Sequence, residues 1–294
     1  MDKYIKGALV ANAATLGFHW IYNGDYLEKL STTQSLLFQK QSKKHFDLAK
    51  PSYYAYPHVE IGSFTTQGMI LKWLYKAMKE NPNMSISDYE TLIYDYTRPG
   101  GSYEGYIETY GKRLIVHKLA KDLNIFIDEK PLMDDHLVGF IPYLVCKELN
   151  LGNNKAWELA SLFTSIEDYK QFYQMFDYIF EHIKSSPLID ILEKAIVYAP
   201  KHYKEKLTQA ITMNDTQLFI NKFAGTACHL PQSIPLIYHM LYHSRSYEDI
   251  INWNAKLGGA SSDRGLILGA LMSQISPIPN SWVLKTKMDF NDIR

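Results

Sequence analysis

The stretch of sequence that indicates the architecture most clearly is residues 247–282, YEDIINWNAKLGGASSDRGLILGALMSQISPIPNSW. Four glycines in this stretch, Gly258, Gly259, Gly265 and Gly269, let a chain turn and let helices approach closely. Ser246 stands just before it, and Asp249 follows three residues later. This spacing matches a capping box, in which side chains satisfy the free amides at a helix start. The stretch therefore predicts closely packed helices around a glycine turn.

Outward from this stretch, apolar residues recur at spacings of three and four, the period of a helix with one buried face. Four such stripes are Met69-Ile70-Trp73-Leu74-Ala77, Leu137-Phe140-Ile141-Leu144-Val145, Phe172-Tyr173-Phe176-Phe180-Ile183 and Ile234-Ile237-Tyr238-Leu241-Tyr242. Further capping boxes are indicated by Ser87 with Glu90 and by Thr164 with Glu167. Strict alternation is rare, so the fold class is predicted to be all-α. Lys40–Pro57 is expected to be an exposed loop.

Composition narrows the possible functions. The 294 residues are 46% hydrophobic, and 31 basic side chains balance 31 acidic ones, so no global field would attract nucleic acid or an anionic membrane. Cys146 and Cys228 are far apart and form no CxxC pair, which argues against a disulfide framework or a structural zinc site. Neither an export signal nor a membrane span is recognised, so we expect a cytoplasmic protein with one domain over residues 1–294.

Three blocks, in order along the chain, resemble signature segments of the ADP-ribosylglycohydrolase superfamily. The first is KGALVANAATLGFHWIY at residues 6–22, whose His19-Trp20-Ile21-Tyr22 ending is similar to the branch that includes the jellyfish J1 crystallins. Asn12 stands where that family commonly has Asp. The second block, GSFTTQGMILKWL at residues 62–74, resembles a Thr-Asp-Asp-Thr segment that supplies magnesium ligands. Thr65 and Thr66 occupy its two Asp positions.

The third and longest block runs from Phe223 to Val283. Gly258 and Gly259 match the family's Gly-Gly-Asp segment, and Arg264 fits its crystallin-like form, but Ala260 and Ser262 replace both acids. A weaker similarity is Met133-Asp134-Asp135-His136, which resembles an acidic segment of the crystallin-like branch. The resemblance implies a compact multi-helix orthogonal bundle of the ADP-ribosylglycohydrolase type. It also implies an activity that hydrolyses ADP-ribosyl glycosidic bonds with two Mg²⁺ ions.

The replaced acids make the usual two-magnesium centre improbable, because hydroxyl groups coordinate Mg²⁺ without neutralising it. We therefore expect no metal ligands and no cofactor, with Mg²⁺ bound only if a degenerate site survives. The candidate catalytic residues are Asp263, Asp134 and Asp135. The candidate ligand-binding residues, several of which the resemblance places at the cleft, are His19, Trp20, Thr65, Thr66, Gly258, Gly259, Ser261 and Arg264.

Each candidate also has a structural interpretation. Asp263 can cap the following helix or pair with a basic side chain, and neighbouring helical residues point about 100° apart, so a shifted acid would not replace Ser262 directly. Arg264 can hold an anion or form an internal ion pair with Asp263, Asp134 or Asp135. His19 can be a packed core histidine. Asp134 and Asp135 can complement a helix dipole, and Cys228 beside His229 is more simply a buried thiol than a nucleophile.

Three functions follow as hypotheses. The first is a divergent protein that lacks the dinuclear centre and binds an ADP-ribose-like or nucleotide ligand, free or on an ADP-ribosylated protein. The second is an active glycohydrolase with rearranged carboxylates drawn from Asp134, Asp135, Asp263, Glu104 and Glu108. The third is a structural, crystallin-like protein whose cleft is filled by its own aromatic side chains. Neither nucleic acid nor membrane is an expected partner.

Overall fold

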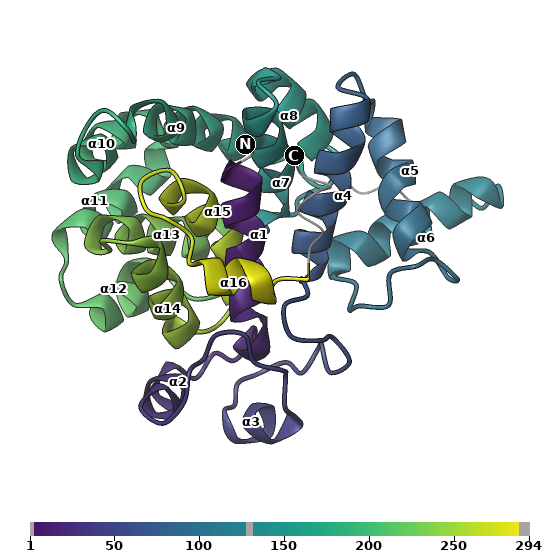
Figure 1. The fold of residues 1–294 in the computed structure, drawn as a ribbon. Coiled ribbons are helices and arrows are strands. Elements are labelled where there is room, and N and C mark those ends of the chain that lie inside the picture. Colours follow the sequence, from purple (N-terminus) through teal and green to yellow (C-terminus); the bar gives the residue numbers. More distant parts are fainter. Residues whose placement is uncertain (1–2, 128–131, 288–294) are drawn as a thin grey trace.

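The computed structural model describes residues 3–127 and 132–287 (Figure 1). Within those ranges the chain consists of helices, turns and loops with three isolated β-bridges and no strand, so the predicted all-α class is confirmed. The α-helices are α1 (Lys3–Thr15), α2 (Gly24–Ser31), α3 (Lys43–Leu48), α4 (Thr66–Glu80), α5 (Ile86–Thr97), α6 (Thr109–Asp122), α7 (Phe140–Glu148), α8 (Gly152–Ala160), α9 (Asp168–His182), α10 (Leu188–Ala195), α11 (Lys204–Thr212), α12 (Thr216–Phe223), α13 (Leu230–His243), α14 (Tyr247–Leu257), α15 (Ser261–Met272) and α16 (Asn280–Lys285). Short 3₁₀ turns are η1 (Leu16–Phe18), η2 (Leu137–Gly139), η3 (Ile196–Tyr198) and η4 (Lys201–Tyr203).

Helices α1 and α15 pack against each other at the centre of the molecule, and every residue of α15 is buried (Figure 1). Helix α1 is buried from Gly7 to Thr15, and α15 buries even the polar residues of its first turn, Ser261, Ser262, Asp263 and Arg264. Glycines bring the two backbones together: a Cβ on Gly269 would lie 2.3 Å from the Gly7 carbonyl oxygen, and one on Gly265 would lie 3.2 Å from Ala11. The glycines of residues 247–282 therefore fix the close packing that they predicted.

The remaining helices surround this pair. Helices α4, α7 and α14 contact α1 directly. In Figure 1, α4, α5 and α6 lie to the right of α1, and α9 to α14 lie to its left. Helices α2 and α3 lie below, beyond the C-terminal end of α1. The four apolar stripes fall in α4, in η2 with α7, in α9 with its C-cap, and in α13, as predicted.

Two of the predicted helix caps were wrong. Helix α5 is capped by Ser85, whose hydroxyl accepts the Asp88 amide in a reciprocal capping box, rather than by Ser87 with Glu90. Met84 before the cap and Tyr89 four residues into the helix are both buried, the positions of a hydrophobic staple, which explains the choice. Thr164 caps no helix.

The cap before α14 was correct, because the Ser246 side chain accepts the Asp249 amide. Lys40–Pro57 is less exposed than expected, since it contains α3 and buries Phe46 and Tyr56. Among the described residues, no helix is long and apolar enough to cross a membrane.

Candidate functional site

The Gly258-Gly259 turn positions one wall of the candidate site. Both glycines have positive φ angles, +70° and +62°, and a side chain on Gly259 would collide with the Thr226 carbonyl. The turn exchanges backbone hydrogen bonds with residues 20 and 21: the Trp20 amide donates to Gly259 O at 2.7 Å, and the Gly259 amide donates to Ile21 O at 2.6 Å. Trp20 itself has φ +70°, which is unusual for a bulky residue and is held by these bonds.

A buried network, which we call the polar floor, consists of Asn12, His19, Thr65, Ser262 and Asp263. The Asn12 amide nitrogen donates to Thr65 Oγ1 at 2.9 Å and to the Ser262 carbonyl at 3.0 Å. In return, Asn12 Oδ1 accepts the Thr65 amide at 3.0 Å. These bonds join α1, the start of α4 and the start of α15. Asn12 therefore links Thr65 to Ser262, two positions where the resemblance implies magnesium ligands.

His19 and Asp263 complete the polar floor, and both are fully buried. His19 Nδ1 accepts the Ser262 amide at 3.1 Å, so this nitrogen carries a lone pair and the ring is neutral. Burial, with a contribution from Arg264, lowers the pKa of His19 well below its usual value, which agrees with a neutral ring. Asp263 Oδ2 lies 3.7 Å from His19 Nε2, and Asp263 Oδ1 accepts the Thr65 hydroxyl at 3.2 Å.

The sequence argument about Asp263 needs correction. It lies in the first turn of α15 and is turned toward Thr65, although we expected it to cap a helix or pair with a base. Burial raises its pKa to about 7, opposed by the Thr65 hydrogen bond and by Arg264. Asp263 is therefore the one carboxylate of the polar floor, enclosed away from solvent.

Arg264 is fully buried and acts as an internal clamp. Its Nε donates to Asn254 Oδ1 at 3.1 Å, and its terminal nitrogens donate to the carbonyls of Thr226 at 2.6 Å and Gly258 at 2.5 Å. The predicted ion pair with Asp263, Asp134 or Asp135 is absent among the described residues. The reason is geometric: the guanidinium fork faces backbone carbonyls that converge on the Gly258 turn. Arg264 thus stabilises the turn that positions Trp20.

Aromatic side chains lie above the polar floor. Trp20 stacks on His19 with ring centroids 4.7 Å apart, and Tyr56 lies 5.8 Å from Trp20 and 6.0 Å from His19. The Tyr56 backbone amide is held by Gln41, whose own amide donates to the carbonyls of Leu16 and His19. The segment that contains α3 is therefore fastened to the end of α1, which closes the polar floor from above.

Thr66 is also engaged from this side. Its hydroxyl lies 3.3 Å from Tyr56 Oη and 3.0 Å from Tyr103 Oη, and it donates to the Tyr106 carbonyl. Both threonines that replace the expected Asp-Asp pair are therefore bonded within the protein. Neither has a side chain directed into open space.

A cleft of about 700 Å³ opens above this aromatic layer. Its volume lies within the range of small-molecule sites. The lining residues come from the segment after η1, the segment after α3, the start of α6 with the residues before it, and the residues just before η2 and α13: Trp20, Tyr22, Ser52, Tyr53, Tyr54, Ala55, Pro57, Tyr106, Glu108, Thr109, His136, Cys228 and His229. No lysine or arginine is among them. The cleft thus has aromatic walls and a polar end formed by Glu108 and the two histidines.

Glu108 is the carboxyl group at the polar end of the cleft. It immediately precedes α6 and is only 3% exposed. Burial, and then the charge of Asp263, raise the pKa of the Glu108 carboxyl well above its usual value. Glu108 lines the cleft, whereas Glu104 is exposed and does not line it.

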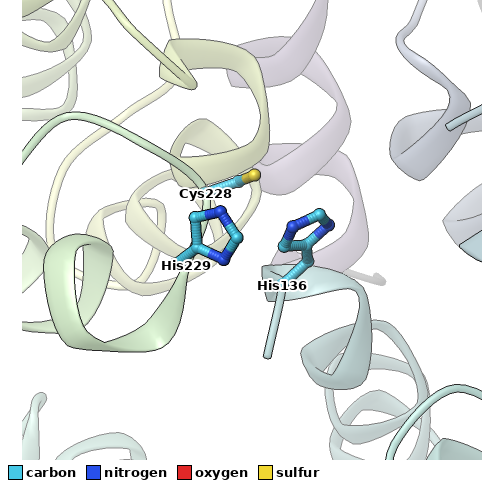
Figure 2. Close-up of side chains that lie close together, drawn as sticks. All are labelled: His136, Cys228 and His229. Atoms are coloured by element: carbon cyan, nitrogen blue, oxygen red, sulfur yellow. The ribbon is translucent and has the colours of Figure 1, made fainter. Parts of the chain in front are cut away.

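Three potential metal ligands, which we call the His–Cys cluster, meet at this end: His136, Cys228 and His229 (Figure 2). One ligand atom from each lies within 4.8 Å of the others. Asp135 Oδ1 is 2.6 Å from His229 Nδ1, and Asp134 Oδ1 accepts the His136 amide at 2.9 Å. Asp134 and Asp135 are thus bonded to the cluster.

Cys228 and His229 do not form a nucleophile pair. Burial, with the nearby charges of Glu108 and Asp263, raises the pKa of the Cys228 thiol, so it is not a reactive thiolate. His229 Nδ1 is bonded to Asp135 rather than to Cys228. The interpretation of Cys228 as an unreactive buried thiol is therefore consistent with its surroundings.

The candidate residues thus fall in different places. Trp20 lines the cleft, whereas His19, Thr65, Thr66, Gly258, Gly259, Ser261, Asp263 and Arg264 lie behind its aromatic wall and do not line it. Asp134 and Asp135 lie beside the polar end. Sequence reasoning missed the tyrosine walls and His136. The signal available for them was weak: an aromatic-rich loop and one histidine after an acidic pair.

A larger hollow of about 1280 Å³ lies between α5, α6 and the residues on either side of 128–131. It borders the undescribed residues, so its wall is incomplete. Asp134 is the only candidate residue that lines it. The smaller cleft therefore remains the candidate site.

Comparison with known proteins agrees with this architecture at the level of fold. No family model matches the chain, and no curated protein matches it. Among solved structures, one described as an "ADP-ribosylglycohydrolase-related protein complex" is similar with a TM-score of 0.62 over 99% of this chain and 94% of that chain. The two sequences are 13% identical. The chain therefore has the fold of that protein, as its sequence blocks implied.

Proposed function

On the premise of this shared fold, we propose that the protein binds a small ligand of the ADP-ribose or nucleotide type in the aromatic cleft and does not hydrolyse it with two magnesium ions. The observation that carries this proposal is the polar floor. Thr65 and Ser262 occupy positions where the resemblance implies metal ligands, and Asn12, where that family commonly has Asp, hydrogen-bonds to Thr65 and to the Ser262 carbonyl. The oxygens of these groups carry no negative charge, so they would not neutralise a magnesium ion.

The cleft above the polar floor has the properties of a binding site. Trp20 and Tyr106 meet edge to face at 5.4 Å, and Tyr22 and Tyr53 meet edge to face at 6.0 Å, which provides flat apolar surfaces for a base or a ribose. Ser52 and Thr109 supply hydroxyls, and Glu108 supplies a carboxyl group whose pKa is raised by burial. Lys112 lies at the rim with its ammonium 4.5 Å from the Tyr106 ring centre. A phosphate would be directed toward that cation.

One observation favours the alternative of a rearranged hydrolase. Glu108 both lines the cleft and has a raised pKa, as a general acid requires. Of the other carboxylates in that hypothesis, Asp263 is enclosed and does not line the cleft, and Asp134 and Asp135 are bonded at the His–Cys cluster. The structural, crystallin-like alternative is supported by the aromatic layer itself. The open volume above that layer favours binding.

The test is isothermal titration of the purified protein with ADP-ribose, with and without Mg²⁺. We expect binding of similar affinity in both conditions. Tyr106→Ala should weaken binding about tenfold or more, since stacking contributes about 1–3 kcal/mol. Tyr198→Ala, which changes an exposed tyrosine outside the cleft, is the matched control and should have no effect.

Three results would argue against this proposal. Appreciable Mg²⁺-dependent release of ADP-ribose from a modified protein would establish the hydrolase. Binding that requires Mg²⁺ would restore the metal centre. No binding in either condition would favour the structural alternative.

A further inference from the structure

The His–Cys cluster has the composition of a transition-metal site. A thiolate and two imidazoles suit Zn²⁺ and its neighbours in the first transition series, whereas Mg²⁺ and Ca²⁺ prefer oxygen ligands. The three ligand atoms lie within 4.8 Å of one another, and a tetrahedral zinc site would bring such atoms to about 3.3–3.6 Å. Side-chain rotations close a gap of this size without moving the backbone.

The backbone already holds the two contributing segments together. His136 and His229 form an isolated antiparallel bridge, although 93 positions separate them in the chain. The Leu137 amide donates to Cys228 O at 3.1 Å, and the Leu230 amide donates to Asp135 O at 2.8 Å. The two imidazole rings lie 4.4 Å apart. The ligands are therefore pre-positioned rather than assembled from flexible loops.

Carboxylates around the cluster are arranged as metal sites require. Asp135 Oδ1 at 2.6 Å from His229 Nδ1 fixes the proton on that nitrogen, which leaves Nε2 with its lone pair. Buried His136 Nδ1 has no hydrogen-bond partner, and Asp134 Oδ1 is 3.6 Å from it. Each histidine thus has a neighbouring aspartate, and one ring nitrogen lacks the partner that burial normally demands.

Charge favours a cation at this place. Asp134 and Asp135 flank the cluster, and no lysine or arginine is among the described residues that line the cleft. The His229 side chain is 46% exposed, so an ion can enter from solvent. From this juxtaposition we propose that His136, Cys228 and His229 bind one transition-metal ion, with Zn²⁺ the best match, and that its fourth coordination position opens into the cleft.

This site is separate from the polar floor and does not depend on the proposed ligand. With three protein ligands it has the open form typical of catalytic rather than structural zinc, so a water molecule or a ligand atom would complete it. All three ligands line the cleft. Such an ion would also supply the positive charge that the cleft walls lack.

The experiment uses the untagged, full-length protein after removal of metals by a chelator. Titration with Zn²⁺ against a chromophoric chelator measures affinity and stoichiometry, and titration with Co²⁺ reports a thiolate ligand through its charge-transfer absorption. We expect one ion per chain and a cobalt–thiolate band. Cys228→Ser should abolish the band and weaken Zn²⁺ at least tenfold, whereas Cys146→Ser, which changes the other buried free cysteine, should leave both unchanged.

A further variant keeps the test decisive if Cys228→Ser fails to fold. Asp135→Asn keeps all three ligands and should weaken Zn²⁺ by about 10–100-fold with the cobalt band retained. Thermal unfolding of each metal-free variant checks folding. The proposal is overturned if Zn²⁺ does not compete with the chelator, if the band persists in Cys228→Ser, or if binding is unaffected in all of these variants.

Discussion

The polar floor and the His–Cys cluster lie near one cleft and differ in how they are placed. In the floor, Asn12 bonds to Thr65 and to the Ser262 carbonyl, which joins α1, α4 and α15. Two buried floor atoms, His19 Nε2 and Asp263 Oδ2, lack a hydrogen-bond partner and lie 3.7 Å from each other, enclosed from solvent. In the cluster, His136 Nδ1 also lacks a partner, but the three potential metal ligands line the cleft. The comparison therefore separates an enclosed network from a cluster that a solute in the cleft can reach.

The largest expected loss of stability comes from substituting Arg264, which supports the turn beside the polar floor. Arg264→Ala removes the side-chain donor from Asn254 Oδ1 and from the Gly258 carbonyl, and takes one of two donors from the Thr226 carbonyl, which keeps the Ala260 amide. Denaturant unfolding should show a loss of about 3–5 kcal/mol. Arg98→Ala, which removes an exposed surface pair with Asp95, should cost less than about 1 kcal/mol. Equal losses would contradict the internal-clamp role.

The next effect is a pH dependence of stability. The pKa of the Asp263 carboxyl is 3.8 in the unfolded chain and about 7 in the folded protein, because burial disfavours the charged form. Between these values the folded protein holds a proton that the unfolded chain has lost. The contribution of Asp263 to the free energy of unfolding is therefore fully present at low pH. It is lost as pH rises through about 7, and the total loss is up to about 4 kcal/mol.

Asp263→Asn isolates that effect. The variant and the parent should have similar unfolding free energies near pH 4, and the variant should be more stable at pH 8. Glu108→Gln serves as the comparison, since the pKa of Glu108 is also raised by burial and its own contribution has the same sign. Parallel pH profiles for the parent and Asp263→Asn would exclude Asp263 as the source.

Asn12→Asp sharpens the contrast by restoring an acid that the family commonly has. The carboxylate loses the two bonds that the amide donates and faces the Ser262 carbonyl, which lies 3.0 Å from the amide nitrogen it replaces. We expect a loss of about 2–3 kcal/mol. Millimolar Mg²⁺ should not restore the thermal midpoint. A Mg²⁺-dependent rise would mean that the floor still accommodates the ion.

The smallest expected losses of stability come from substitutions in the His–Cys cluster. His229→Ala removes a side chain that is 46% exposed, so the metal-free protein should lose about 1 kcal/mol or less. The same change should abolish the stabilisation that Zn²⁺ provides to the parent in thermal unfolding. A large loss of unfolding free energy in the metal-free variant would show that His229 stabilises the fold itself. It would contradict the difference drawn between the polar floor and the His–Cys cluster.

The sequence was most informative where local rules decide structure. Stripes such as the one from Met69 to Ala77 predicted helices, because a period of 3.6 admits few other folds. The glycines at 265 and 269 predicted close packing. The cap at Ser87 was wrong because overlapping Ser-x-x-acid patterns begin at 85 and 87, and buried flanking residues decide between them.

The site was less predictable, because it depends on contacts between distant segments. His136 meets His229 only through a bridge that no local pattern encodes. The sequence favoured a buried thiol at Cys228, and nothing in it indicated that His136 lies beside Cys228 and His229. Asp263 shows the converse: its burial beneath Trp20 follows from the Gly258-Gly259 turn and not from its own neighbours in the sequence.

The most direct test of the central claim, that hydrogen bonds have replaced magnesium in this fold, is calorimetric titration of the untagged, metal-free protein with Mg²⁺. We predict no saturable heat at millimolar Mg²⁺, because the floor offers one enclosed carboxylate, and its neutral side chains carry no charge to balance the ion. Saturable binding that Asp263→Asn abolishes would contradict the account and place the ion where the family's own centre lies.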